Sequence, residues 1–266
     1  MQDHRVDRGG LSIHARISGS EDANAPTVVF ANSLGTDLRI WDDVVAHLPE
    51  TLRIVRFDKR GHGLSSVPPA PYAMGALVTD AEAVCDELDV RDCVFVGLSI
   101  GGLIAQGLAV KRMDIVRAMV LSNTAAKIGT PSLWEARIEA VKAHGMDNLA
   151  DGVMERWFSR RFRESDDLAT WRQHLIDCPP EGYIGCCAAI SGTDFYSSTA
   201  SLRLPTLVIA GSEDKATPPD LVRETADLIP GARFELMRGS GHLPCIEHPQ
   251  DYADLLTGFL KEIGHV

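Results

Sequence analysis

Residues 93–102, Cys93-Val-Phe-Val-Gly-Leu-Ser-Ile-Gly-Gly102, are the part of this 266-residue chain that decides its fold. An apolar run leads into Gly97-Leu-Ser-Ile-Gly101, and apolar residues at helical spacing follow it. The pattern predicts a buried strand that turns sharply into a buried helix. A serine between two glycines at such a turn is typical of a nucleophile. The glycines are needed because the backbone is strained at Ser99 and its neighbours are crowded.

Strands and helices alternate on both sides of this turn. Short apolar runs predict strands at Thr27–Ala31, Arg53–Phe57, Val116–Leu121, Leu207–Ala210 and Ala232–Met237. Segments with helical spacing lie between them, and a last helix is predicted to begin at Pro249. Such alternation predicts a mostly parallel, twisted α/β sheet flanked by helices. Residues 11–17 alternate with period two, which predicts an antiparallel edge strand.

One internal segment interrupts the alternation. Residues 126–199 hold helical stretches without a convincing strand, and they contain three of the four tryptophans, Trp134, Trp157 and Trp171. The simplest architecture is a core of residues 1–125 and 200–266 with a helical cap inserted at 126–199.

Composition limits the classes of function. The chain is 45% hydrophobic and carries a formal net charge of -11, so it lacks the basic face that nucleic-acid binding needs. The uncharged segment 93–110 contains several glycines and polar residues, and we expect no membrane partner. The first residues show no secretory signal, and the six cysteines show no zinc spacing, so we expect reduced thiols and a cytoplasmic location. No motif implies a metal or a cofactor.

The predicted nucleophile needs a base, and the base needs a carboxylate that orients it. Asp214 follows the strand ending at Ala210, and His242 follows the strand ending near Met237. The carboxyl ends of parallel strands lie along the sheet edge where ligands bind, and Ser, Asp, His is the chain order associated with this turn. We expect Ser99, Asp214 and His242 to form a catalytic triad, with Glu213 as the competing carboxylate.

Acyl transfer also needs donors for the oxyanion, each worth about 2.7–4 kcal/mol of barrier. One expected donor is the backbone N–H of Ile100. The other is the N–H of Leu34, in the loop Asn32-Ser-Leu-Gly35 that follows a predicted strand. The segment Asp58-Lys-Arg-Gly-His-Gly63 is interpreted as a tight structural turn.

Several of these motifs are shared with a known family. They are Asn32-Ser-Leu-Gly-Thr-Asp-Leu38, Phe57-Asp-Lys-Arg-Gly-His-Gly-Leu-Ser65, Gly97–Gly102, Asn123-Thr-Ala-Ala-Lys-Ile-Gly129, Trp134-Glu-Ala-Arg137 and Cys186-Cys-Ala-Ala-Ile190. Over essentially its full length the chain resembles the α/β-hydrolases, and among them the 3-oxoadipate enol-lactonases of bacterial aromatic catabolism. It differs at Ile100, where methionine is common, and at Lys59, where threonine is usual; neither is a triad position.

The resemblance implies a serine hydrolase that opens the ring of 3-oxoadipate enol-lactone through an acyl-enzyme, in the β-ketoadipate pathway. This small-molecule substrate carries a carboxylate, which a chain of charge -11 repels at long range, so a local cation is needed. Arg137, near Trp134 at the start of the cap, is the first candidate, and Lys127 is the second.

Two alternatives stay open. A carboxylesterase or another lactonase would share the triad and differ in its pocket. A ligand-binding relative without turnover belongs to another functional class, and the intact triad disfavours it.

Overall fold

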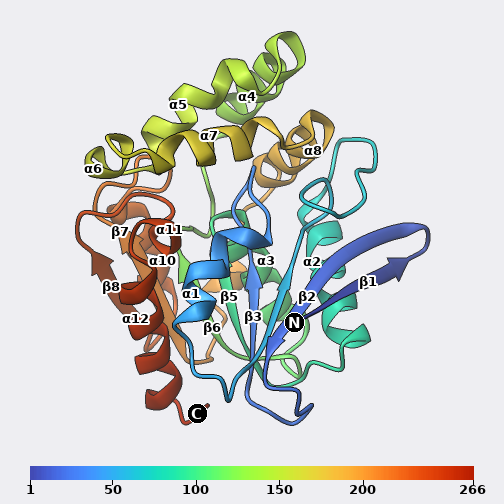
Figure 1. Cartoon of the computed structure of the whole chain (residues 1–266), viewed down its shortest axis with the longest axis vertical. Coiled ribbons are helices and arrows are strands. Elements are labelled where there is room, and N and C mark those ends of the chain that lie inside the picture. Colours follow the sequence, from blue (N-terminus) through green and yellow to red (C-terminus); the bar gives the residue numbers. More distant parts are fainter.

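An eight-stranded sheet forms the centre of the computed structural model, which describes residues 1–266 (Figure 1). Its strands are β1 (Gln2–Arg8), β2 (Leu11–Gly19), β3 (Thr27–Ala31), β4 (Arg53–Phe57), β5 (Cys93–Leu98), β6 (Val116–Ser122), β7 (Thr206–Gly211) and β8 (Arg233–Met237). The order across the sheet is β1-β2-β4-β3-β5-β6-β7-β8. Only β2 runs in the opposite direction to the other seven strands. The predicted α/β class with a mostly parallel sheet is confirmed.

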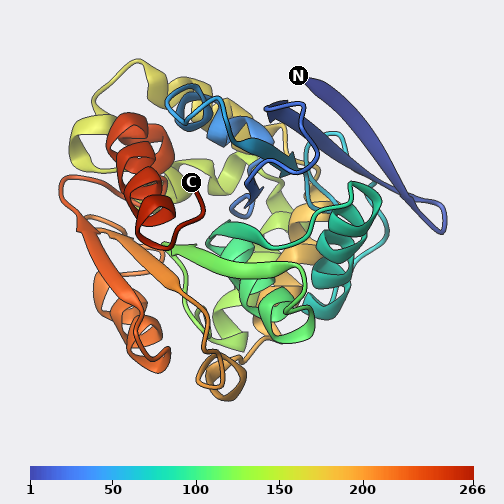
Figure 2. The same ribbon diagram turned by 90° about the horizontal axis from the view of Figure 1, so that it is seen from below.

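Helices cover both faces of this sheet (Figure 2). A short 3₁₀ helix, η1 (Leu38–Trp41), leads into α1 (Asp42–Ala46), which packs with α12 (Pro249–Glu262) on one face. The other face carries α2 (Met74–Glu87), α3 (Ile100–Lys111) and α10 (Pro219–Leu228). Because both faces are covered, β3, β4, β5 and β7 are buried at every residue. This double burial explains the apolar runs of β3, β5 and β7, whereas β4 also buries Arg53 and Arg56.

The antiparallel end of the sheet differs from the prediction. β1 pairs with β2, so β2 is the second strand and β1 forms the edge. Only Val6 is buried in β1, and the strand therefore lacks the apolar pattern by which the others were found. Gly9 and Gly10 connect the two strands with positive φ angles of 63° and 89°. This glycine pair is the hairpin signal that could have revealed the strand.

Five helices lie over the edge where the parallel strands end (Figure 1). They are α4 (Pro131–His144), α5 (Asp147–Trp157), α6 (Arg160–Arg163), α7 (Asp167–Ile176) and α8 (Pro180–Ser191). A further short helix, α9 (Tyr196–Thr199), packs against α3 and α10 instead. We propose that α4–α8 are the cap; its division from the core at 125/126 and 199/200 stays a prediction. No helix combines the length and apolar character needed to cross a membrane.

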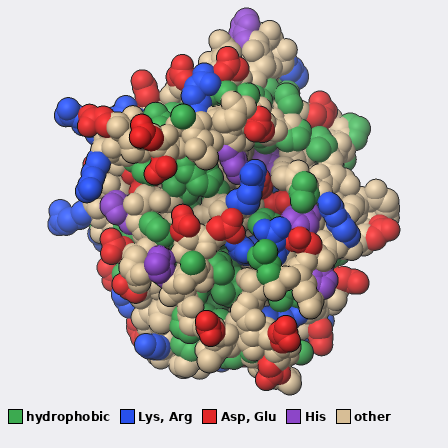
Figure 3. Space-filling view, in the orientation of Figure 1, with side chains coloured by type: hydrophobic (Ala, Val, Ile, Leu, Met, Phe, Trp, Pro, Cys, Tyr) green, Lys and Arg blue, Asp and Glu red, His purple; other side chains and the backbone are tan.

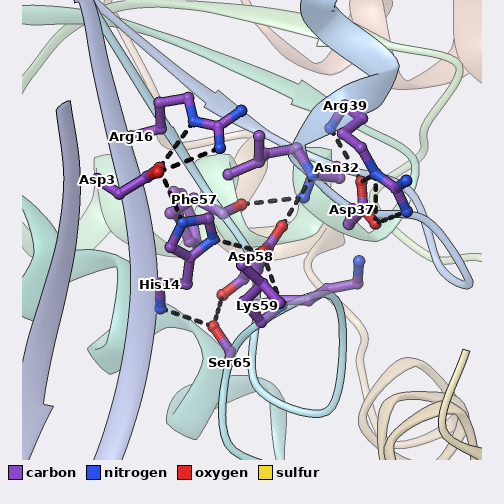
Figure 4. A network of polar contacts seen from close by, with 12 residues as sticks. Asp3, His14, Arg16, Asn32, Asp37, Arg39, Phe57, Asp58, Lys59 and Ser65 are labelled. Atoms are coloured by element: carbon purple, nitrogen blue, oxygen red, sulfur yellow. Dashed lines mark hydrogen bonds and ion pairs between the residues drawn. The ribbon is translucent and has the colours of Figure 1, made fainter. Parts of the chain in front are cut away.

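A buried polar cluster joins β2 to the end of β4 (Figure 4). The His14 Nδ1 lies 2.7 Å from Asp58 Oδ2, and the Nε2 lies 3.1 Å from Asp3 Oδ1. The hydrogen bond with Asp58 raises the pKa of His14 above its ordinary value, although burial opposes the shift. The cluster therefore favours a protonated His14 between two carboxylates.

Replacing His14 tests this charge through the pH dependence of stability. Because folding raises the pKa of His14 above the ordinary value of about 6.5, the native state binds this proton more tightly than the unfolded chain does. The stabilisation is complete below about pH 6.5 and is lost as the pH rises through the raised pKa. Thermal melts should show the Tm advantage of wild type over His14→Gln shrinking as the pH rises. An advantage that grows with pH would contradict a charged His14.

Candidate active site

Ser99 stands at the turn between β5 and α3, as the sequence predicted. Its backbone has φ 57° and ψ -116°, a strained conformation for a residue with a side chain. A Cβ at Gly97 would lie 2.2 Å from the carbonyl oxygen of Gly101, and one at Gly101 would lie 2.2 Å from that of Ala31. Glycine is therefore required on both sides of Ser99, since any side chain there would force the strand and helix apart.

Asp214 and His242 meet at the ends of two neighbouring strands. The His242 Nδ1 lies 2.8 Å from Asp214 Oδ2, and the two residues are only 1% and 4% exposed. Burial by itself would raise the pKa of Asp214, but the charge of His242 and hydrogen bonds from His242, Asn123 and Thr217 hold it below its ordinary value. Asp214 is thus an ionised carboxylate bonded to the imidazole. The competing Glu213 accepts a hydrogen bond from the Arg160 N–H instead.

Asn123 supports this pair and was not identified as a site residue from sequence. Its Nδ2 donates to Asp214 Oδ2 at 2.9 Å and to the Gly241 carbonyl at 3.1 Å. It has a positive φ of 47°, which asparagine tolerates better than most residues. Its position directly after the end of β6 could have suggested a site residue. Its partners lie about a hundred residues away in sequence, however, and only the fold brings them together.

Ser99 and His242 line the same cavity, which has a volume of about 110 Å³. The Ser99 hydroxyl makes no hydrogen bond to the imidazole in this structure; the Ser33 hydroxyl lies 3.5 Å from its Nε2. Catalytic hydrogen bonds are often long before substrate binds and tighten in the complex. The structure therefore brings Ser99 and His242 to one cavity, with Asp214 bonded to the imidazole outside the cavity lining and the serine–histidine bond unformed.

The N–H groups of both expected oxyanion donors lack a hydrogen-bond acceptor within the protein. Ile100 begins α3, so its N–H has no partner within the helix. Leu34 lines the cavity, and its N–H donates to no acceptor in the protein. The two groups can therefore still receive a hydrogen-bond acceptor.

Of the expected substrate-binding residues, two lie in this cavity and one does not. Trp134 and Arg137 line it, and the Arg137 guanidinium lies 5.0 Å from the centre of the Trp134 ring. The expectation for Lys127 is corrected, because its amine pairs with Asp194 at 3.0 Å on the protein surface. Ile128 lines the cavity, whereas the neighbouring Lys127 does not.

Arg156 and Lys215 also line the cavity, and neither cation was predicted from the sequence. Neither they nor Arg137 form an ion pair with a carboxylate. Burial and the positive charge of Arg137 lower the pKa of Arg156, so the two guanidinium groups repel each other electrostatically. Three cations without a counterion around one small cavity favour an anionic ligand. Arg156 stands next to Trp157 in sequence, but no spacing rule shows that α4 and α5 share a cavity.

A larger cavity of about 380 Å³ lies on the other side of the loop formed by residues 33–36. Ser33 and Leu34 line the active-site cavity, whereas Gly35 and Thr36 line the larger one. The larger cavity has Arg16, Arg39 and His174 among its lining residues but none of the triad candidates. Basic and histidine side chains gather among acidic ones near the middle of the face in Figure 3. Arg16 and Arg39 are already paired with Asp3 and Asp37.

Comparisons with known proteins agree with this geometry. The family model described as alpha/beta hydrolase fold matches residues 26–249. The chain is 38% identical to 3-oxoadipate enol-lactonase 1 of Acinetobacter baylyi over 97% of its length and 96% of that protein. It is 33% identical to 3-oxoadipate enol-lactonase 2 of the same organism, over 91% of each chain.

Among solved structures, the enol-lactonase from Burkholderia xenovorans LB400 superimposes with a TM-score of 0.92 at 37% identity. The alignment covers 97% of this chain and all of that one. The chain belongs to the alpha/beta hydrolase family and, within it, to the enol-lactonase group.

Proposed function

We propose that this protein is a carboxylic ester hydrolase that opens 3-oxoadipate enol-lactone to 3-oxoadipate. The observation that carries the proposal is the small cavity in which a serine and a histidine lie beside three unpaired cations. Cavities for drug-sized ligands hold about 300–1,000 Å³, so this one suits a much smaller molecule. A cyclic ester with a free carboxylate fits this cavity, because its ester suits the serine nucleophile and its carboxylate suits the three cations. The named relatives, 33% and 38% identical, support the same substrate.

In the proposed mechanism, Ser99 Oγ attacks the ring carbonyl while His242 takes the hydroxyl proton. Asp214 holds the imidazole in the tautomer that can accept this proton and stabilises the imidazolium that forms. The carbonyl oxygen becomes an oxyanion, which the N–H groups of Leu34 and Ile100 bind. The ring C–O bond then breaks, and His242 returns the proton to the enol oxygen.

The acyl-enzyme is released by water. The leaving enol stays attached to the acyl group, so ring closure competes with hydrolysis until the enol tautomerises to the ketone. His242 then removes a proton from water as it attacks the ester carbonyl, and the proton passes to Ser99 Oγ as 3-oxoadipate leaves. Tautomerisation makes ring opening effectively irreversible.

The cations are proposed to bind the substrate carboxylate. Hydrogen bonds to charged groups contribute about 1.5–3 kcal/mol, so Arg137→Ala and Arg156→Ala should each raise KM for the lactone about 10- to 100-fold. Hydrolysis of a neutral ester such as p-nitrophenyl acetate should change little, since it has no carboxylate to bind. Steady-state kinetics on both substrates measure the difference.

Lys127→Ala is the matched control, because it removes a cation of the same region whose amine pairs with Asp194 on the surface. It should leave both activities unchanged. If Arg137→Ala or Arg156→Ala impaired the neutral ester as strongly as the lactone, that arginine would have no role in carboxylate recognition.

A direct assay decides between the proposed substrate and the alternatives. Purified protein is given 3-oxoadipate enol-lactone and a panel of neutral esters, and lactone loss is followed spectrophotometrically. A kcat/KM for the lactone well above those for the esters supports the proposal. Preference for neutral esters would make the protein a carboxylesterase, and tight lactone binding without turnover would make it a non-catalytic binding protein.

We also propose that the protein works in the cytoplasm. All six cysteines are unpaired and buried. Burial raises the pKa of Cys85, Cys178 and Cys186 to about 12, which keeps these thiols protonated and unreactive. Unpaired, protonated cysteines suit a reducing compartment.

A further inference from the structure

Lys59 is a buried cation that contacts the loop carrying the oxyanion donor Leu34. It follows the end of β4 and is only 2% exposed. Its Nζ donates to the carbonyl oxygens of Ser33 at 2.6 Å and Thr36 at 3.0 Å. Both contacts are to backbone, and they stand on either side of Leu34 and Gly35.

The carbonyl that Lys59 contacts belongs to the same peptide group as the Leu34 N–H. A peptide group is planar and trans, so its C=O and its N–H point in opposite directions. Holding the Ser33 oxygen toward Nζ therefore directs the Leu34 N–H away from Lys59. The N–H has no acceptor in the protein, and Leu34 lines the cavity that contains Ser99.

His62 holds the next peptide group of the loop. The Gly35 N–H donates to His62 Nε2 at 2.9 Å, and the ring is only 1% exposed. Burial and the neighbouring Lys59 hold the pKa of His62 well below its ordinary value, so Nε2 is a neutral acceptor. With Lys59 on one peptide and His62 on the following one, neither can rotate independently.

The turn that carries Lys59 and His62 is itself anchored by Asp58. The Asp58 carboxylate accepts from the Leu38 N–H at 2.8 Å, from the Leu64 N–H at 3.0 Å and bonds His14 at 2.7 Å. Figure 4 shows the Lys59 side chain leaving this cluster and extending toward the segment that contains Asp37. The Lys59 side chain is therefore fixed at its base by the anchored turn and at its amine by the two carbonyls that it contacts.

We propose that Lys59 is a positioning residue for the oxyanion hole, which sets the Ser33–Leu34 peptide so that the Leu34 N–H faces the oxyanion formed at Ser99. The inference rests on the proposed role of Leu34 in acyl transfer. Burial lowers the pKa of Lys59, but the amine and the ammonium both carry N–H donors for the two carbonyls. When protonated, the amine also polarises the peptide and strengthens its N–H as a donor.

The test replaces Lys59 with methionine, an apolar side chain of similar length. Loss of one oxyanion donor costs about 10²–10³ in kcat, and a displaced donor should cost part of that, so we expect kcat to fall about 10- to 100-fold with KM little changed. The affinity for a boronic acid that forms a tetrahedral adduct with Ser99 should fall by a similar factor. The affinity for 3-oxoadipate, which forms no tetrahedral adduct with Ser99, should stay within about twofold of wild type.

Arg53→Met is the matched control, since Arg53 is a buried cation at the other end of β4 that donates to the Leu88 carbonyl at 2.7 Å. It removes a similar buried contact far from the loop and should leave kcat and boronic acid affinity unchanged. If Lys59→Met does not fold, Lys59→Leu supplies the same comparison, since leucine also lacks an N–H donor. An unchanged kcat, or equal losses of boronic acid and 3-oxoadipate affinity, would overturn the proposal.

The same variants are assayed with p-nitrophenyl acetate, which also passes through an oxyanion. If wild type hydrolyses this ester but not the lactone, the proposed substrate is wrong while the Lys59 test still stands. If both substrates are hydrolysed and Lys59→Met slows neither, the substrate is right and the positioning role is wrong.

Discussion

Ser99→Ala should lower kcat by about 10⁶, since removal of a catalytic serine leaves only the contribution of the oxyanion donors and substrate binding. The substitution takes away the oxygen that forms the acyl-enzyme at the turn between β5 and α3. Alanine keeps the Cβ of serine and adds no atom, so the strained backbone at φ 57° gains no new steric contact. Single-turnover kinetics on the lactone would measure the loss.

Folding and binding provide the controls for this variant. Its Tm and circular dichroism should match those of wild type, because the Ser99 hydroxyl makes no hydrogen bond that stabilises the native state. Binding of 3-oxoadipate should persist. Near-normal turnover by Ser99→Ala would remove the acyl-enzyme mechanism and with it the proposed role of the triad.

Asp214→Asn should lower kcat by about 10⁴, the second largest effect we expect. The carboxylate accepts the Nδ1–H of His242 at 2.8 Å, which leaves Nε2 free to take the serine proton. An asparagine can present an N–H to Nδ1 instead, which favours the wrong tautomer, and it cannot stabilise the imidazolium by charge. Asn123 and Thr217 donate to the same carboxylate oxygen, so they too are matched to an anion.

Glu213→Gln is the control for this effect. Glu213 precedes Asp214 in sequence, and its carboxylate accepts the Arg160 N–H, a bond that glutamine can also accept. Its kcat should stay close to that of wild type. If Asp214→Asn kept more than about a tenth of the wild-type kcat, an orienting role for this carboxylate would be contradicted.

The triad candidates could be placed from sequence because each follows a recognisable strand. β5, β7 and β8 are parallel, so the residues just beyond their ends reach the same edge of the sheet. The glycines on either side of Ser99 indicated that the backbone passes close to Ala31 and to the first turn of α3. These are local patterns combined with a rule of topology, and they sufficed to choose Ser99, Asp214 and His242 as candidates.

The substrate-binding residues could not be placed in this way. Arg137 was chosen as a candidate because it lies near Trp134 in sequence, but the second candidate cation, Lys127, pairs with Asp194 on the surface. Arg156 was missed because it lies on a different cap helix, α5, whose packing against α4 brings both arginines to one cavity. The periodicity of one helix does not predict which other helix its side chains will contact.

The amino-acid pattern alone therefore determined the α/β class, the sharp turn at Ser99 and the edge of the sheet where its partners gather. Tertiary structure decided which cations face the cavity and that Lys59 and His62 hold the loop of Leu34. The physical reason is one of range. Burial and backbone strain act on neighbouring residues and leave a trace in the sequence, whereas a hydrogen bond between segments depends on how separate elements pack.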